Sequence, residues 1–141
     1  QGLDAARPNP AILSCLDRVD GIVICPSNPY VSVDPMLHLP GMRDALMNAS
    51  APVVAVSPIV GGAAIKGPTA KMMRELAIPN TASAVAAHYG DLLDGFILDE
   101  QDKGIEDALG VPAVVTQTVM VTLQDRVDLA RDVLAFIQKL T

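Results

Sequence analysis

The chain has 141 residues, of which half are hydrophobic and 18% are charged, and its formal net charge is −6. This composition is able to bury a hydrophobic core, and the length suits a single domain rather than a disordered segment. Scattered Lys and Arg residues, an aromatic content of 3% and the lack of Trp argue against a nucleic-acid-binding surface. No apolar run reaches the roughly 20 residues that a membrane span needs.

The N-terminal residues are polar and do not form the apolar region of a secretory signal. Residue 1 is Gln rather than Met, from which we expect the chain to be part of a longer polypeptide. Cys15 and Cys25 are the two cysteines, and they lack CxxC spacing. Cys25 ends an apolar run and is predicted to be a buried thiol, and a cytoplasmic location is expected.

Short apolar runs predict four β-strands, at residues 21–25, 52–56, 95–98 and 112–115. They are rich in β-branched residues and continuous rather than alternating, which is typical of strands buried on both faces of a parallel sheet.

Helical patterns lie before, between and after these runs. Helices are expected to begin at Asn9–Pro10, at Pro40, at Gly67–Pro68, at Thr81, near Asp102 and at Thr122. The expected buried residues are Ile12, Leu13, Leu16, Val19, Met42, Leu46, Met72, Met73, Leu76, Val85, Tyr89, Leu92, Ile105 and Leu109. In the last helix, Thr122 and Asp125 resemble a capping box, and the expected apolar stripe is Leu123, Val127, Ala130, Leu134 and Ile137. Alternating helices and strands predict an α/β layered architecture with right-handed crossovers.

In such sheets ligands bind beyond the carboxyl ends of the strands. The first strand leads into Pro26-Ser27-Asn28-Pro29-Tyr30, where Ser27 and Asn28 offer a hydroxyl and an amide to a nucleobase edge or a phosphate oxygen. The alternative is an ordinary strand-to-helix turn, because Pro, Ser and Asn are common in turns.

The second strand leads into a longer glycine-rich loop, residues 57–69. Gly61 and Gly62 allow close approach of the backbone to a ligand, and Lys66 adds a positive charge next to the Gly67–Pro68 helix start. The loop is a candidate phosphate or diphosphate site, although it is neither a Walker A loop nor G-x-G-x-x-G. A plain glycine-rich turn is the alternative interpretation.

Other polar residues are weaker candidates. His38 and His88 are each more consistent with packing or surface roles than with function. Asp94, Asp99, Glu100 and Asp102 flank the end of the third strand. They are able to act as Mg²⁺ ligands or as caps of the next helix, and we favour caps.

The two loops together resemble a known family. Pro26-Ser27-Asn28-Pro29, Ser32 and Pro40-Gly41-Met42-Arg43 are similar to the stretch "PSNP…S…PG(I/M)R" of the 2-phospho-L-lactate transferases. Residues 57–73 resemble that family's "SP(I)xGGxAxKGPxxxMM". The pieces His88-Tyr89, Leu93-Asp94-Gly95-Phe96, Asp99 and Asp102, and then Thr116, Thr118 and Met120, fit later motifs. The resemblance extends from about Pro10 to the end of the chain.

The resemblance implies a Rossmann-like three-layer α/β transferase with a mainly parallel sheet. Such an enzyme transfers a phosphorylated three-carbon acid, phospholactate or phosphoenolpyruvate, from a guanosine-diphosphate-activated donor to the deazaflavin Fo. GMP is released, Mg²⁺ is required, and the product belongs to coenzyme F420 biosynthesis. The site residues implied to hold the donor are Ser27, Asn28, Pro29, Ser57, Gly61, Gly62, Lys66 and Gly67.

The family's glycine-rich first loop and its acidic "NTGDD" stretch are missing from this sequence. We therefore expect residues 1–141 to be the C-terminal half of one Rossmann-like domain, to be inactive alone, and to lack the metal ligands; no catalytic residue is assigned. Members of the family tend to dimerise, and the sequence leaves open whether this chain forms a homodimer. The alternatives are a regulatory protein of the same fold that binds UDP-sugars without turnover, and a scaffold domain that has lost activity. The choice of three-carbon acid stays open.

Overall fold

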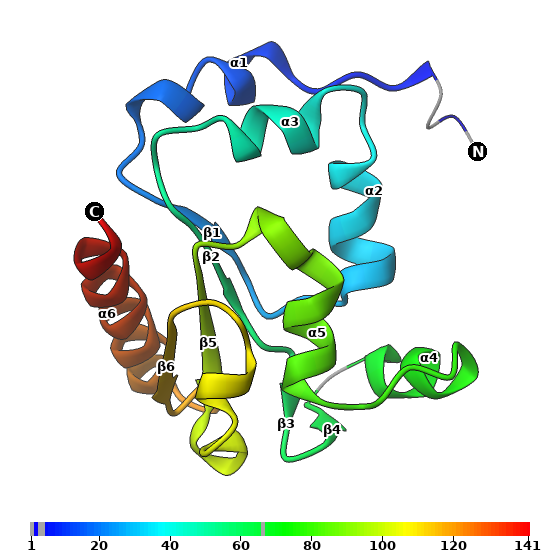
Figure 1. Ribbon diagram of the computed structural model, residues 1–141, viewed down its shortest axis with the longest axis vertical. Coiled ribbons are helices and arrows are strands. Elements are labelled where there is room, and N and C mark those ends of the chain that lie inside the picture. Colours follow the sequence, from blue (N-terminus) through cyan, green and yellow to red (C-terminus); the bar gives the residue numbers. More distant parts are fainter. Residues whose placement is uncertain (1, 3–4, 66) are drawn as a thin grey trace.

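The computed structural model describes residues 2, 5–65 and 67–141. The predicted strands are confirmed: β1 (Ile22–Ile24), β2 (Val53–Val56), β5 (Gly95–Asp99) and β6 (Ala113–Thr116) form a parallel sheet in the order β1-β2-β5-β6 (Figure 1). The middle strands β2 and β5 are buried along their whole length, as their continuous apolar sequences require.

Helices cover both faces of this sheet, so the fold is the expected layered α/β arrangement. α5 (Ala82–Tyr89) lies on one face and α6 (Leu123–Leu140) on the other (Figure 1). The α5 side includes Val53, Ala55 and Phe96, while the α6 side includes Val54 and Ile97. Successive strand residues thus point alternately into the two halves of the core.

The direction in which α6 packs differs from the sequence prediction. The predicted capping box is confirmed, since Thr122 Oγ1 accepts from Asp125 N and Asp125 Oδ2 accepts from Thr122 N. The buried residues, however, are Leu129, Val133, Phe136 and Ile137, so that only Ile137 of the predicted stripe is buried. Leu123, Val127, Ala130 and Leu134 are exposed. The apolar residues of α6 cover a wide arc, and spacing alone does not say which part of that arc faces the sheet.

Two glycines allow α6 to approach the sheet closely. A Cβ atom on Gly95 would lie 2.7 Å from Phe136 Cε1, and one on Gly21 would lie 2.7 Å from Ile137 Cγ2. These distances are shorter than real carbon contacts, so α6 packs directly on backbone at both positions.

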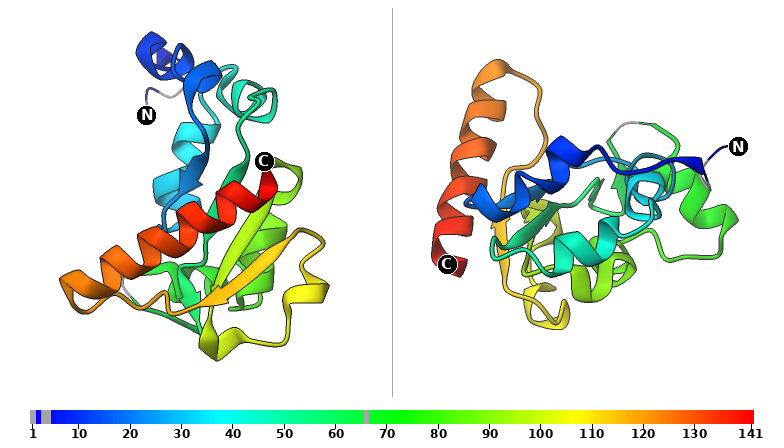
Figure 2. Two further views of the ribbon diagram at one scale, coloured as in Figure 1. Left: turned by 90° about the vertical axis from the view of Figure 1, so that its left-hand side faces the viewer. Right: turned by 90° about the horizontal axis from the view of Figure 1, so that it is seen from above.

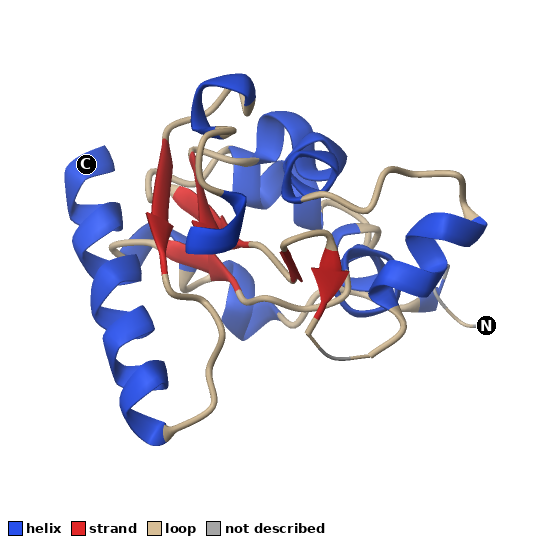
Figure 3. Ribbon diagram, turned by 90° about the horizontal axis from the view of Figure 1, so that it is seen from below, coloured by secondary structure: helices blue, strands red, loops and turns tan. Residues whose placement is uncertain are grey.

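A small hairpin follows β2. β3 (Ile59–Val60) and β4 (Ala63–Ala64) are antiparallel, and they stand apart from the main sheet (Figure 3). The two residues between them are Gly61 and Gly62, with φ of 54° and 76°. A two-residue hairpin turn with both φ values positive strongly favours glycine.

Short helices occupy the connection from β1 to β2, part of which the sequence analysis treated as a loop. A π-helix (Pro29–Val33) and α2 (Asp34–Leu37) precede α3 (Met42–Met47). At the N-terminal side, Asn9 caps α1 (Pro10–Leu13) as predicted, but this helix is short and a 3-10 turn (Leu16–Arg18) follows it. Within that segment Leu16 is buried, whereas Ile12, Leu13 and Val19 are exposed.

Between β2 and β6 the helices follow the prediction more closely. α4 (Thr69–Glu75) buries Met73, but the predicted core residue Leu76 is exposed because it lies beyond the last turn. α5 buries Val85 and Tyr89, and Leu92 is buried in the 3-10 turn Gly90–Leu92. Further 3-10 turns span Glu100–Asp102 and Glu106–Ala108.

Two smaller corrections follow from the topology. Cys25 is exposed rather than buried, because β1 is an edge strand that pairs only with β2 among the described strands. Asp102 does not cap the turn at Glu106–Ala108; its carboxylate instead accepts from Gly61 N. No helix in the described part of the chain is long and apolar enough to cross a membrane.

Candidate functional site

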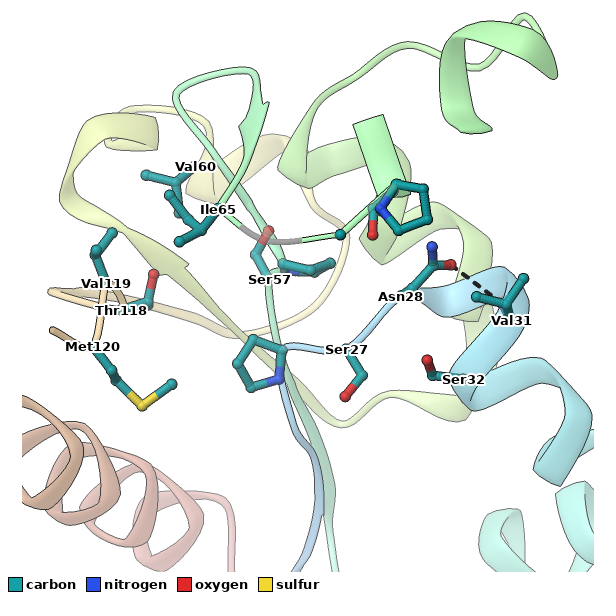
Figure 4. Close-up of a pocket in the computed structure, with 15 residues that line it drawn as sticks. Ser27, Asn28, Val31, Ser32, Ser57, Val60, Ile65, Thr118, Val119 and Met120 are labelled. Atoms are coloured by element: carbon teal, nitrogen blue, oxygen red, sulfur yellow. Dashed lines mark hydrogen bonds between the residues drawn. The ribbon is translucent and has the colours of Figure 1, made fainter. Parts of the chain in front are cut away.

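A cavity of about 350 Å³ lies where the sequence analysis expected a ligand site, beyond the carboxyl ends of the strands. Its walls come from the segments that follow β1, β2 and β6, together with the start of α4 (Figure 4). The lining residues are Pro26, Ser27, Asn28, Val31, Ser32, Ser57, Pro58, Val60, Ile65, Gly67, Pro68, Thr69, Thr118, Val119 and Met120.

Asn28 forms the corner of the first wall. Its Oδ1 accepts from Tyr30 N at 2.9 Å and from Val31 N at 3.3 Å, which caps the π-helix. Its Nδ2 has a weak partner, Met72 Sδ at 3.3 Å. Because the oxygen is committed to the backbone, Asn28 is suited to donate to a ligand and not to accept from one.

The neighbours of Asn28 have different roles. Ser27 lines the cavity with Ser32, and Figure 4 shows both on the same side as Asn28. Pro29 is buried and starts the π-helix, but it does not line the cavity. Its contribution is to fix the backbone that carries Asn28 and Ser32.

Ser57 lines the cavity floor, and its hydroxyl is already used within the protein. Ser57 Oγ donates to Ile59 O at 2.8 Å and accepts from Ile59 N at 3.1 Å, and the residue is 1% exposed. The serine therefore fixes the turn from β2 into the hairpin.

The structure separates the glycine pair of the second loop from Gly67. Gly67 lines the cavity, whereas Gly61 and Gly62 form the hairpin turn and do not line it. Asp102 and Asn80 bind the backbone of that turn, at Gly61 N and Gly62 O. Lys66 lies outside the described residues; its sequence neighbours Ile65 and Gly67 both line the cavity. Phosphate binding by Gly61, Gly62 and Lys66 stays a prediction.

A third wall was not proposed as a site from the residues alone. Thr118, Val119 and Met120 follow β6 and stand opposite Ser27 and Asn28 (Figure 4). The signal that would have found it is the position of these residues beyond the end of the fourth predicted strand.

Asp99 holds this wall in place. Its Oδ2 accepts from Thr118 N at 2.8 Å and from Thr118 Oγ1 at 3.0 Å, and its Oδ1 accepts from Gln101 N at 3.1 Å. Burial alone would raise the pKa of this carboxyl, but hydrogen bonds, above all from the backbone of Thr118 and Gln101, lower it below its usual value. Asp99 is therefore a buried, ionised brace between β5 and the cavity wall.

Two other carboxylates near β5, Asp94 and Asp102, have partners within the protein too. Asp94 Oδ2 accepts from Val53 N at 2.8 Å, and Asp102 accepts from Gly61 N. Within the described residues, no group of three His, Cys, Asp or Glu side chains could hold a metal ion. The described residues thus offer no Mg²⁺ site, and Mg²⁺ binding by residues outside this chain stays a prediction. Asp99 caps the 3-10 turn Glu100–Asp102, whereas Asp94 and Asp102 accept from the backbone N–H groups of Val53 and Gly61 and do not cap a helix.

The two histidines lie outside the cavity lining. His88 Nε2 is 2.9 Å from Asp34 Oδ1, and the His88 ring packs edge-on against Tyr30 at 4.9 Å. His38 Nδ1 is 2.7 Å from Asp34 O. Burial, followed by the charge of Asp34, raises the pKa of both Tyr30 and Tyr89. This cluster connects α5 to α2 and has no visible catalytic geometry.

The described lining of the cavity offers hydrogen-bonding groups and apolar surface and has no charged side chain. Among its described lining residues, the polar groups are hydroxyls and one amide, and the rest is apolar. Such a surface suits a ligand with an apolar ring and a polar, hydrogen-bond-accepting end. The fold and site define an α/β domain with a candidate small-molecule site at the carboxyl edge of its sheet.

Comparison with known proteins identifies the family to which this domain belongs. The model of the family "2-phospho-L-lactate transferase CofD" matches residues 2–136, and the chain belongs to this family. It is 47% identical over 102 residues to a phosphoenolpyruvate transferase of Thermobifida fusca, covering 72% of this chain and 31% of the relative. It is 37% identical over 142 residues to a phosphoenolpyruvate transferase of Kitasatospora aureofaciens, covering 98% and 44%. It is 39% identical over 132 residues to a 2-phospho-L-lactate transferase of Methanosarcina barkeri, covering 92% and 42%. The chain therefore spans less than half the length of these relatives.

Proposed function

We propose that this chain forms the donor-binding half of a transferase in coenzyme F420 biosynthesis. In this proposal a phosphorylated three-carbon acid, phospholactate or phosphoenolpyruvate, passes from a guanosine-diphosphate-activated donor to the deazaflavin Fo, and GMP leaves. The relatives named phosphoenolpyruvate transferase and 2-phospho-L-lactate transferase support both versions of the acid.

The single observation that carries the proposal is the cavity beyond β1, β2 and β6. It brings together four of the residues implied by the family resemblance, namely Ser27, Asn28, Ser57 and Gly67. Asn28 Nδ2 and the hydroxyls of Ser27 and Ser32 are groups that can donate to phosphate oxygens. Apolar residues such as Val119 and Met120 offer a surface for a ring.

Transfer between a diphosphate and a hydroxyl depends mainly on positioning and on neutralising charge. The described lining residues are uncharged, while the chain as a whole carries a net charge of −6. A cation is therefore needed. In this proposal Lys66 supplies it, since its sequence neighbours line the cavity, and Mg²⁺ is held by residues outside this chain.

Calorimetric titration of the chain with GDP, with UDP-glucose as the competing ligand, tests the proposal. We expect GDP to bind at least about tenfold more tightly. Asn28→Asp keeps the oxygen that caps the π-helix but replaces the donor with an anion, so it should weaken GDP binding by about tenfold or more. Asn48→Asp adds the same charge at the end of α3 and is the matched control.

Lys66→Gln should weaken GDP binding more than it weakens binding of guanosine, which carries no phosphate. Lys139→Gln near the end of α6 controls for net charge. Preference for UDP-glucose would favour the regulatory alternative. Equal effects of Asn28→Asp and Asn48→Asp would show that GDP does not bind in this cavity.

A further inference from the structure

α6 carries a second apolar face that the described part of the chain leaves uncovered. Leu123 is 74% exposed, Val127 37% and Leu134 59%, and Ala130 is exposed as well. These residues follow one another at intervals of four, three and four, so they lie on one side of the helix. This side is distinct from the face formed by Leu129, Val133 and Phe136, which packs on the sheet.

Two contacts show which way this side points. On one flank of α6, Asp132 accepts a hydrogen bond from Thr116 at the end of β6. On the other flank, Ile137 packs against Gly21, directly before β1. Leu134 and Ala130 precede Ile137 by three and seven residues and share its flank. The uncovered side of α6 therefore faces away from β6 and toward the β1 edge of the sheet. Figure 2 shows β1 and β6 on opposite sides of the α6 ribbon.

The sheet beneath that side is also uncovered. Val23 of β1 is in register with Val54 of β2, so both side chains are on the α6 face of the sheet. Val54 is fully buried under α6, whereas Val23 is 39% exposed. Cys25, two residues further along the chain, is exposed too. We call Val23, Cys25, Leu123, Val127, Ala130 and Leu134 the β1–α6 surface.

The dimensions of this surface fit one helix. Strands are about 4.8 Å apart and a helix is about 10 Å wide, so each helix covers about two strands. α6 packs against residues of β2, β5 and β6, and β1 lies beyond it. Sheets made of parallel strands are normally covered on both faces, and here the α6 face is covered everywhere but over β1.

We propose that an amphipathic helix lies beside α6 over β1, and that it belongs to the part of a CofD-family protein that this chain does not span. The relatives have room for it, since the chain covers 44% of the Kitasatospora protein and 42% of the Methanosarcina protein. Among the described strands, β1 pairs only with β2, so its other edge is free. A strand and its connecting helix from the rest of the protein can therefore add to the sheet, the strand parallel to β1 at this edge and the helix over β1. A second copy related by a two-fold axis would instead bring the two β1 strands together antiparallel.

The full-length Kitasatospora protein, with its matching stretch replaced by this chain, provides the test. In this chimera we expect Leu134→Asp to lower Tm by at least about 4 °C, because the leucine is buried there. In the 141-residue chain alone the same change should have little effect. Leu76→Asp, at a leucine that is 55% exposed just beyond α4, is the matched control and should have little effect in both proteins.

Thiol labelling gives a second measurement. Cys25 should react with a thiol reagent at least about tenfold more slowly in the chimera than in the chain alone, and Leu134→Asp should restore the fast reaction. Unchanged reactivity of Cys25 in the chimera, or equal Tm losses from Leu134→Asp in both proteins, would overturn the proposal. So would a dimer of the 141-residue chain that Leu134→Asp converts to a monomer, because the partner would then be a second copy.

Discussion

Replacement of Asp99 by Asn removes the charge that braces the third wall of the cavity. The carboxylate accepts three hydrogen bonds from Thr118 and Gln101 and is 3% exposed. The asparagine oxygen is able to keep both bonds from Thr118, but without charge, and the asparagine NH₂ then faces Gln101 N–H, donor against donor. Loss of charge assistance and one unsatisfied buried donor together cost about 2–4 kcal/mol of unfolding free energy.

The effect of pH has a definite sign. The pKa of Asp99 in the folded chain lies below the usual 3.8. The ionised carboxyl therefore stabilises the fold fully above about pH 4, and this contribution is lost as the pH falls through the folded pKa. The stability difference between the native chain and Asp99→Asn should be constant from pH 5 to pH 7 and should narrow below about pH 4.

Urea denaturation at several pH values measures this difference, and calorimetry measures GDP binding to the same proteins. We expect the variant to bind GDP about tenfold more weakly at a temperature where it remains folded, because the 118–120 wall is released. Asp107→Asn, at an exposed position, is the charge-matched control. Equal stability of Asp99→Asn and Asp107→Asn at pH 7 would refute the proposed role of the Asp99 carboxylate in holding the 118–120 wall.

Three further substitutions test the packing and capping described above. Thr122→Ala should lower the unfolding free energy by about 1 kcal/mol in urea denaturation, because α6 loses its N-cap bond; no change would contradict the capping box. Gly95→Ala should cost about 1–3 kcal/mol through collision with Phe136, and Phe136→Leu in the same chain should recover part of that loss in thermal melts. Tyr30→Phe should leave stability unchanged or raise it by up to about 1 kcal/mol, because the Tyr30 hydroxyl is buried with no hydrogen-bond partner among the described residues; a clear loss would reveal one.

The sequence predicts the sheet well because its strands are short, continuous and β-branched, a pattern that fits burial on both faces. It fails at α6, where apolar residues occupy both the sheet-facing arc and the adjoining side. Leu134 and Leu129 look alike to a periodicity argument, yet one is exposed and the other is buried. Which arc turns inward depends on contacts with Gly95 and Gly21, and these are known only once the sheet is assembled.

The candidate site was predicted only in part, because local patterns identify some of its residues and contacts between distant residues determine the others. Ser27, Asn28 and Gly67 follow strand ends or start a helix, positions that local patterns identify. The third wall depends on Asp99 reaching across to Thr118, 19 residues later in the chain. Gly61 and Gly62 look like a ligand loop in sequence, whereas the antiparallel pairing of Ile59–Val60 with Ala63–Ala64 makes them a hairpin turn.

Each wall of the cavity is fixed by side-chain atoms whose hydrogen bonds are made inside the protein: Asn28 Oδ1, the Ser57 hydroxyl and the Asp99 carboxylate. A ligand that enters such a preorganised cavity loses little affinity to ordering of the loops. Substitutions that alter ligand preference without loss of shape should therefore be found at Ser27, Ser32 and Met120. The three bracing residues, by contrast, leave little scope for change.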